Sequence, residues 1–390
     1  MATIEKRGNS YRIMASCGYD VDGTQEKRRM TWKPEPGMTE RQIQKELQRQ
    51  AVLFEEECRR GYVIQKSMKF EEFAKQYFDN YVVQNLRIRT ATEYHRMEKK
   101  TYKAIGHLKM DKITPIQIQK FVKSLLKGDG KNRALSPKTA KNYLAFVSSV
   151  FAYAIQMRVV KENPCHAVTV ALGEHEDRDC YTLEEAQQFL DLLAKEPLFY
   201  QAFFTLAIYG GYRRGELCGL EWKDIDFNTC VISIQRTSLY TKDQGTFTDT
   251  TKTKSSKRSL KLPVGVIDIL RRYRAEQNSE RLKMGDQWIN YDRLFVGWDG
   301  QPVNPNSPYK WLCRFCERTG MRRAKSAIHS FRHLNASLLI TSGVDVKTVS
   351  NALGHTQVST TTNIYAHTFA KVQADASDAI AAALPLKSHA

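Results

Sequence analysis

The spacing of hydrophobic residues changes along the chain, from short strand-like runs at the start to helical periodicity afterwards. Two strand-like runs, SYRIMASCGYD at 10–20 and KRRMTWK at 27–33, flank the turn sequence DVDGTQ. Runs of this kind on either side of a turn predict a β-hairpin. The first part of the chain is therefore expected to contain a small antiparallel sheet, which we take to be three-stranded.

A long helix is predicted directly after this sheet. The sequence PEPG at 34–37 interrupts the strand pattern, and Thr39 and Gln42 then have the spacing of a helix capping box. The helix is expected to run to about Arg60. Its apolar side is predicted to hold Leu47, Val52 and Phe54. Sheet and helix together predict a first domain at residues 1–64.

The pattern of residues 65–165 is helical throughout, which predicts a small helical domain. Apolar residues recur at helical spacing across 70–83. Two further helices, in ITPIQIQKFVKSLL and LSPKTAKNYLAFVSSVFAYAI, are expected to start at Thr114 and Ser136. Each of these two residues is an N-cap type followed by proline, a favoured first helical residue.

Periodicity is lost across residues 166–179, which predicts a linker. Thr182 and Glu185 then form a second capping box, and residues 180–390 predict one larger, mainly helical domain. One strand pair is expected in it, at 229–237 and 257–263. The predicted fold class is therefore mainly α with small β-sheets, an α+β arrangement.

The charge of the chain favours a polyanionic partner. Its 390 residues include 60 Lys and Arg against 42 Asp and Glu, a formal net charge of +18. An excess of this size is typical of proteins that bind nucleic acid. The alternative is a basic protein whose charge serves only solubility.

The sequence gives no sign of a membrane segment or a metal centre. No run approaches 18 apolar residues, and the N-terminus MATIEKRGNS lacks the apolar stretch of a secretory signal. The eight cysteines are therefore expected to stay reduced. Only Cys313 and Cys316 have metal-like spacing, but they lack a second pair and lie in an amphipathic helical pattern, which favours packed thiols over zinc.

Four separated clusters in the last domain are candidates for chemistry, and the first contains Arg213 and Glu216. Both lie among apolar residues, where a charge needs a partner or a ligand. One interpretation is an internal ion pair on one helix face. The other is an arginine that Glu216 holds and that points at a phosphate.

The second cluster is the basic sequence TKTKSSKR at 251–258, between the two predicted strands. Basic hairpin tips are often only solvated, but this one is also suited to placing a lysine on DNA. The basic residues are Lys252, Lys254, Lys257 and Arg258. Lys138, Thr139 and Lys141 form a further basic group on a helix N-terminus, where free N–H groups favour phosphate; a solvated face is the alternative.

The third cluster contains His329 and His333, four residues apart as in zinc metalloproteases. The general-base Glu of that motif is missing because position 330 is Ser, which argues against zinc hydrolysis. His329 and Arg332 instead share a helix face that suits an anion. The fourth cluster, LGHTQVSTTTNIYAHT at 353–368, places Tyr365 ten residues after His355.

In this order the clusters resemble the active-site motifs of the tyrosine recombinases, or phage-type integrases. The motifs are Arg213-x-x-Glu216, a hairpin lysine, His329-x-x-Arg332, Leu353-Gly354-His355 and Tyr365. Single members are common, whereas the complete set is specific. The resemblance covers residues 175–385, and the helical domain resembles the family's core-binding domain. The N-terminal domain resembles the arm-binding domain of integrases from phages and conjugative elements.

The resemblance implies a site-specific DNA recombinase that cuts and rejoins DNA through a 3′-phosphotyrosyl link, integrating and excising a mobile element. It assigns Tyr365 as nucleophile, His329 as base and Lys252 as general acid, with Lys254 as the second choice. Arg213, Arg332 and His355 would bind the phosphate, and Glu216 and His333 would support them. The expected DNA contacts are Lys138, Thr139, Lys141, Lys254, Lys257 and Arg258.

The resemblance also implies which partners and cofactors to expect. The link conserves the phosphodiester, so no nucleotide is expected, and the loop KGDGKNRA departs from a phosphate-binding loop. No metal is expected either, because the sequence shows no carboxylate cluster suited to Mg²⁺ and the two arginines make a metal unnecessary. Expected partners are double-stranded DNA with core-type and arm-type sites, three further copies of the chain, an excisionase and a host DNA-bending protein. The expected location is the bacterial cytoplasm, on the nucleoid. The tail at 371–384 would pack on a neighbouring protomer or on its own domain.

Two other functions fit parts of the sequence. One is a DNA-binding regulator on the same fold, which the intact set from Arg213 to Tyr365 argues against. The other is a type IB topoisomerase-like enzyme, which the separate N-terminal domain argues against.

Overall fold

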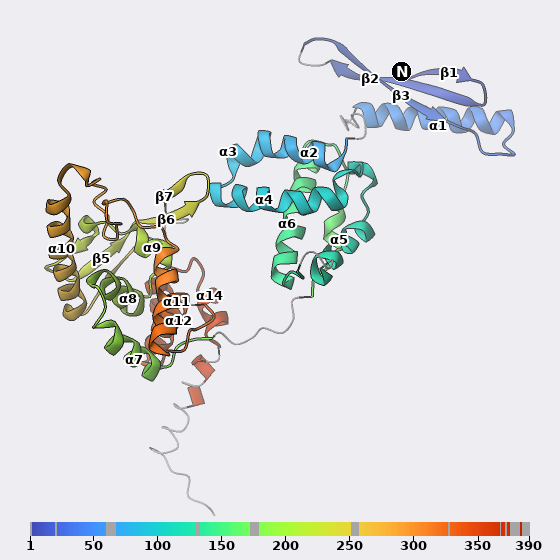
Figure 1. Cartoon of the computed structure of the whole chain (residues 1–390). Coiled ribbons are helices and arrows are strands. Elements are labelled where there is room, and N and C mark those ends of the chain that lie inside the picture. Colours follow the sequence, from blue (N-terminus) through green and yellow to red (C-terminus); the bar gives the residue numbers. More distant parts are fainter. Residues whose placement is uncertain are drawn as a thin grey trace, which may run out of the picture. The chain divides into compact units, whose positions relative to one another are not determined.

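The computed structural model describes residues 2–19, 22–59, 68–128, 133–171, 179–250, 257–326, 328–366, 368–370, 373–374 and 383. They form two compact units, residues 1–175 and 176–390 (Figure 1). The boundary falls within the predicted linker. Helices predominate and the sheets are small and antiparallel, which confirms the predicted fold class.

The N-terminal sheet has three antiparallel strands, β1 (Thr3–Arg7), β2 (Ser10–Tyr19) and β3 (Gln25–Trp32), with β2 in the centre. The predicted hairpin is the β2–β3 pair, in which Ile13 lies opposite Met30. Ile13 is buried, since its face of the sheet is covered by the helix that follows.

That helix, α1 (Glu40–Arg59), begins where the capping box predicts. The backbone N–H of Thr39 donates to Oε1 of Gln42 at 2.9 Å, satisfying a donor that has no partner within the helix. Leu47 and Ala51 bury against the sheet. The prediction for Val52 is wrong: its side chain is 59% exposed, and Ala51 one position earlier faces the sheet instead.

The helical part of the first unit contains α2 (Phe70–Tyr77), the π-helix η1 (Phe78–Val82), α3 (Val83–Asn85), α4 (Ile88–Thr101), the π-helix η2 (Tyr102–Gly106), α5 (Pro115–Lys127) and α6 (Pro137–Gln156). Short 3-10 turns lie at Met110–Lys112 and Pro164–Ala167. Both predicted helix starts are confirmed. The backbone N–H of Thr114 donates to Oε1 of Gln117, and the backbone N–H of Thr139 donates to the Ser136 hydroxyl. Phe70, Phe146 and Phe151 lie in the shared core.

The second unit consists of helices around α8 (Leu198–Gly210), whose side chains are buried on almost every side. The other helices are α7 (Leu183–Leu193), α9 (Arg214–Gly219), α10 (Val264–Met284), α11 (Ser307–Thr319), α12 (Ile328–Thr341), α13 (Val346–Leu353) and α14 (Val358–Ile364). Short 3-10 turns lie at Trp222–Asp224 and Gly285–Gln287. Since α8 contacts both α10 and α12, it forms the centre of this unit.

Two small sheets lie among these helices. The first orders β4 (Ile225–Asp226), β5 (Val231–Ile234) and β8 (Arg258–Lys261), and Ile232 lies opposite Leu260 in the predicted strand pair. The second is a hairpin of β6 (Arg236–Thr241) and β7 (Gly245–Thr250) that the hydrophobic pattern did not predict. The basic sequence at 251–258 therefore follows β7 and leads into β8.

Within the described ranges, no helix has the length and apolar composition needed to cross a membrane.

Candidate active site

Four of the predicted catalytic residues of the second unit lie on or directly next to four separate helices that meet in space. Arg213 precedes α9, Arg332 lies on α12, and His355 follows α13. Tyr365 ends α14. The structure therefore brings together residues that are up to about 150 positions apart in the sequence.

Glu216 connects Arg213 to the core through a capping box. Arg213 has extended backbone geometry before α9, so the expected placement of both residues on one helix face is wrong. Its backbone N–H donates to Glu216 Oε2 at 2.9 Å, and its Nη1 donates to Oε1 at 2.7 Å. The Arg213 side chain stays 37% exposed while that of Glu216 is 4% exposed. Arg213 is thus both ion-paired and open to a ligand.

Arg258 is the second cation on Glu216, which corrects its predicted role as a DNA contact. Its Nη1 and Nη2 donate to the two carboxylate oxygens at 3.2 and 2.9 Å. Its side chain is only 7% exposed, because the pair packs beneath the surface. Burial opposes ionisation of Glu216, but hydrogen bonds and charge from Arg258, then the charge of Arg213, lower the Glu216 pKa to about 2. Glu216 therefore carries its charge at neutral pH.

Three consecutive carbonyl oxygens at the end of α13 each accept a hydrogen bond from a different arginine. Ala352 accepts from Arg258 Nε (2.7 Å), Leu353 from Arg332 Nη2 (2.6 Å) and Gly354 from Arg213 Nη2 (3.0 Å). The last carbonyls of a helix carry partial negative charge and have no partner within the helix, so cations stabilise them. The end of α13 thereby gathers three guanidinium groups into one cluster, which we call the arginine cluster.

Gly354 is required at this point of the Leu-Gly-His motif. Its φ of 65° is left-handed, a conformation that glycine adopts at the least cost. A Cβ atom there would also lie 2.8 Å from Nη1 of Arg258, which is too close. Any other residue at this position would push against the Arg258 side chain.

Arg332 is the most deeply buried member of the arginine cluster. Nη1 donates to the carbonyl of Gly211 at 2.7 Å, and Nη2 donates to Nε2 of His355 at 3.0 Å as well as to Leu353. Burial, then the neighbouring charge of Arg213, lower the pKa of Arg332 to about 9. That value is still above neutral pH, so the guanidinium remains charged.

His355 is held as a neutral imidazole of one tautomer. Because an arginine can only donate, Nε2 must be the acceptor of the bond from Arg332. Nδ1 then carries the proton and donates to the Thr361 hydroxyl at 2.8 Å. Burial, followed by the charge of Arg332, lowers the pKa of His355 to about 4. Thr361 is itself completely buried.

Tyr365 is packed inside its own unit. Its side chain is 2% exposed and lies among Ala336, Ile340, Val349 and Leu353. Its hydroxyl lies 2.7 Å from Nδ1 of His333, which is 3% exposed. His329, one helical turn earlier and exposed, meets the His333 ring edge-on with 4.9 Å between ring centroids. The neighbour of the hydroxyl is thus the histidine that was assigned only a supporting role.

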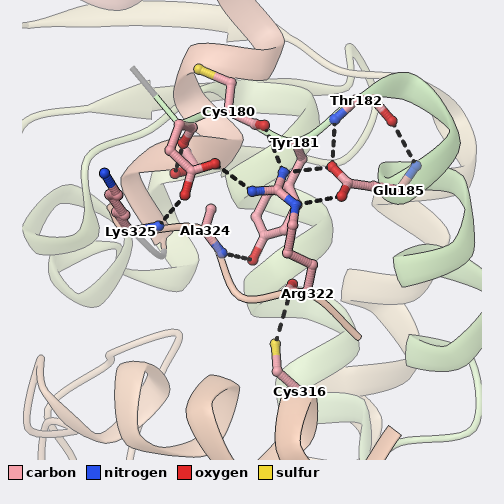
Figure 2. A network of polar contacts seen from close by, with 10 residues as sticks. Cys180, Tyr181, Thr182, Glu185, Cys316, Arg322, Ala324 and Lys325 are labelled. Carbon is pink, nitrogen blue, oxygen red and sulfur yellow. Dashed lines mark hydrogen bonds and ion pairs between the residues drawn. The ribbon is translucent and has the colours of Figure 1, made fainter. Parts of the chain in front are cut away.

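A second polar network fixes the loop that leads into α12 (Figure 2). Figure 2 shows the Arg322 guanidinium between Glu185 and the carbonyl of Cys180, to which Nη2 donates at 2.7 and 2.8 Å. Nη1 of Arg322 also binds Asp179, whose other oxygen accepts from the Lys325 N–H at 2.7 Å. That backbone bond, assisted by Arg322, holds the Asp179 pKa below its usual value. The start of the second unit is therefore tied to the residues before His329.

Sequence reasoning missed this network because its partners lie more than 130 residues apart. Only Glu185 carried a signal, and that was for its capping box with Thr182, which the structure confirms.

The remaining predicted residues lie elsewhere or outside the described residues. Lys252 and Lys254 lie outside the residues that the structure describes, while Lys257 is exposed just before β8. Lys138 and Lys141 are exposed on the first turns of α6, and Thr139 is half-buried. Cys316 is buried on α11 and Cys313 partly so. Across the described residues, no group of three His, Cys, Asp or Glu is arranged to hold a metal ion.

Comparison with protein families gives two matches. Residues 180–371 match the phage integrase family, and residues 69–126 match the phage integrase N-terminal SAM-like domain. The tyrosine recombinase XerC-like protein of Caldanaerobacter subterraneus is 32% identical over 286 residues, covering 69% of this chain and 71% of that protein. The ICEBs1 integrase of Bacillus subtilis is 28% identical over 272 residues, with the same shares.

Solved structures show a similar fold. The Tn1549 transposon integrase, in complex with a circular intermediate DNA, superposes with a TM-score of 0.65 at 21% identity, covering 79% of this chain and 99% of that one. A lambda integrase dimer bound to a core site gives a TM-score of 0.55 at 17% identity, covering 76% and 95%.

Proposed function

Because the chain belongs to the phage integrase family of tyrosine recombinases, we propose that Tyr365 attacks a DNA phosphate held by Arg213, Arg332 and His355. The enzyme is a tyrosine-type site-specific recombinase that integrates and excises DNA. The observation that supports these residue roles is the arginine cluster at the end of α13, with Tyr365 packed in the same unit.

The arginine cluster suits the chemistry of a phosphodiester. Attack on phosphorus collects negative charge on the non-bridging oxygens, and preorganised donors stabilise that charge most effectively. Arg213 uses Nη1 for Glu216 and Nη2 for Gly354, and because its side chain is 37% exposed its remaining N–H groups can reach a phosphate oxygen. Removal of one such donor is expected to raise the barrier by about 2–4 kcal/mol.

His355 must change its hydrogen bonds to take part. In the free protein its Nε2 accepts from Arg332, so it has no proton there to give to a phosphate oxygen. We infer that a bound phosphate draws the Arg332 donors to itself and that His355 then protonates at Nε2. The phosphate itself supplies the negative charge that favours this protonation.

The leaving 5′-oxygen needs a proton, and Lys252 remains the proposed donor, with Lys254 as the second choice. The products are a 3′-phosphotyrosyl link and a free 5′-hydroxyl. This link keeps the phosphodiester energy, so rejoining with a second 5′-hydroxyl needs no nucleotide.

Double-stranded DNA is the proposed substrate, since structures of two similar integrases contain DNA. Residues 65–165 would bind core-type sites through Lys138, Thr139 and Lys141, and Lys257 would contact DNA from the catalytic unit. Residues 1–64 would bind arm-type sites. Four protomers would exchange strands, with the tail at 371–384 packed in cis or in trans, assisted by an excisionase and a host DNA-bending protein.

A suicide substrate tests this proposal. A duplex with the core site flanking the element, nicked next to the scissile phosphate, releases a short 5′-hydroxyl strand on cleavage and traps the covalent adduct. We expect an adduct for the wild type and none for Tyr365→Phe. The matched control is Tyr209→Phe, which removes the hydroxyl of an exposed tyrosine in the same unit and should leave the adduct unchanged.

The other two functions predict different results. A regulator would bind the site but form no adduct in the wild type. A topoisomerase-like enzyme would form the adduct and relax supercoiled plasmid, but would not join strands from two duplexes. An adduct formed by Tyr365→Phe would show that a different residue is the nucleophile.

A further inference from the structure

The hydroxyl of Tyr365, the nucleophile of the proposed reaction, lies within hydrogen-bond distance of His333. The Tyr365 hydroxyl and Nδ1 of His333 lie 2.7 Å apart, and both side chains are almost fully buried. Their rings are tilted at 57° with centroids 5.6 Å apart. In the tautomer that carries its proton on Nε2, Nδ1 of His333 accepts the hydrogen of the Tyr365 hydroxyl. A contact of this length suits proton transfer.

The chemistry of Tyr365 requires such a neighbour. A free phenol has a pKa of about 10 and a free imidazole of about 6.5, so at neutral pH the phenol holds its proton and the imidazole can accept one. Burial in an apolar cluster excludes bulk water from this role. A side chain therefore has to take the proton.

We propose that His333, rather than His329, accepts the proton of Tyr365 when the tyrosine attacks DNA. This inference rests on the proposed function, in which Tyr365 is the nucleophile. The Tyr365 O–H bond breaks as Nδ1–H forms on His333. The phenolic oxygen then bonds to phosphorus, and the 5′-oxygen leaves with a proton from the general acid, for which Lys252 is the proposed residue. In the rejoining step His333 returns its proton to Tyr365.

The surroundings of the pair support this assignment. Arg332, directly before His333 on α12, is close enough for its charge to interact with that of Tyr365. A phenolate formed by proton loss would therefore face a guanidinium, which stabilises it. His329 is exposed, and its ring meets that of His333 edge-on, with 4.9 Å between centroids. Its position suits contact with the incoming DNA.

The test compares His333→Asn with His329→Asn on the nicked suicide substrate. The Asn carbonyl oxygen lies close to the place of Nδ1, so it keeps an acceptor for the hydroxyl but takes up no proton at neutral pH. First-turnover rates of adduct formation are measured from pH 5.5 to 9, and DNA binding is measured by mobility shift.

We expect His333→Asn to bind DNA like the wild type but to form adduct about 10²–10⁴-fold more slowly. The wild-type rate should rise with pH through an imidazole inflection that His333→Asn lacks and His329→Asn keeps. A substrate with a 5′-bridging sulfur, whose leaving group needs no proton, should not rescue His333→Asn, because its defect lies on the nucleophile.

Wild-type rates and an unchanged inflection in His333→Asn would overturn the proposal, as would loss of the inflection in His329→Asn alone. Rescue by the bridging sulfur would also overturn it, since His333 would then be serving the leaving group. If His333→Asn does not fold, His333→Ala is assayed with added imidazole, where restored adduct supports the proposal and its absence overturns it. Failure of the wild type to form adduct would instead refute the proposed function.

Discussion

Arg258 presents its two terminal nitrogens to the two carboxylate oxygens of Glu216, and Glu216 in turn accepts from Nη1 of Arg213. The planar fork of an arginine fixes the orientation of a carboxylate as well as its charge. Since Arg258 also holds the end of α13 through Ala352, it connects two parts of the site. Arg258 is therefore a positioning residue that acts through Glu216.

Replacing Arg258 by Ala is expected to destabilise the second unit. It leaves Glu216 buried with one cation fewer, and loss of one partner from a buried ion pair costs about 3–5 kcal/mol. Urea unfolding followed by tryptophan fluorescence measures this effect. Four of the five tryptophans report on the second unit: Trp222, Trp288, Trp298 and Trp311.

Lys257→Ala is the matched control, because Lys257 is the exposed neighbour of Arg258. It should leave stability unchanged and, if it contacts a phosphate, reduce the slope of log affinity against log salt by about 0.9. Arg258→Ala should not change that slope. If Arg258→Ala instead keeps the stability of the wild type and reduces this slope, Arg258 is a DNA contact as first predicted.

Acid should remove the contribution of Glu216 to stability. Its pKa falls from 4.5 to about 2 on folding, so the stabilisation is complete above pH 4.5 and is lost as pH falls towards 2. Between pH 6 and pH 3 the loss from this group is about 2 kcal/mol. Urea unfolding of Glu216→Gln at both pH values should show a difference smaller by that amount.

The control for this experiment is Glu280→Gln, which removes an exposed carboxylate paired with Lys283 at the surface. Its pH dependence should match the wild type. If Glu216→Gln is as acid-sensitive as the wild type, the charge of Glu216 does not hold the arginine cluster together.

His355 should be a neutral imidazole protonated at Nδ1 in the free protein at pH 7. Its pKa of about 4 lies below that of the unfolded chain, so its stabilisation is present above pH 6.5 and lost as pH falls through 4. Nitrogen-15 NMR identifies the tautomer, with Thr361→Val removing the acceptor of Nδ1–H and Thr361→Ser keeping it. A proton on Nε2 at pH 7 would contradict the bond from Arg332.

Much of the local structure was predictable because its causes are local. The helix starts at Thr39, Thr114, Ser136 and Thr182 each depend on a cap within three residues, and all four are confirmed. The β6–β7 hairpin was not predicted from the sequence. Its position depends on packing against α9, which is a tertiary contact.

The sequence predicted which residues form the candidate site, but not which of them contact one another. Resemblance identified Arg213, Arg332 and Tyr365, because fixed motifs mark them. Nothing in the sequence placed Arg258 on Glu216, 42 residues away, so a basic run was interpreted as a DNA contact. Likewise the His-x-x-Arg motif favoured His329 as the base, and only the distance to the Tyr365 hydroxyl points to His333.

The lysines on the first turns of α6 either bind DNA phosphates or are only solvated, and the salt dependence of DNA binding distinguishes these two possibilities. Lys138 and Lys141 are exposed there, beside backbone N–H groups that attract anions. If they neutralise phosphates, each replacement by Ala should lower the slope of log affinity against log salt by about 0.9. Fluorescence anisotropy with labelled core DNA at several salt concentrations measures this slope.

Lys123→Ala is the matched control, since Lys123 is an exposed lysine of α5 in the same unit. Phosphate contacts carry no sequence information, so the α6 variants should lose affinity for core DNA and for unrelated DNA to the same degree. Equal slopes for Lys138→Ala, Lys123→Ala and the wild type would mean that the lysines of α6 are only solvated. A loss confined to core DNA would instead mean that they read bases, because only base contacts distinguish the two DNAs.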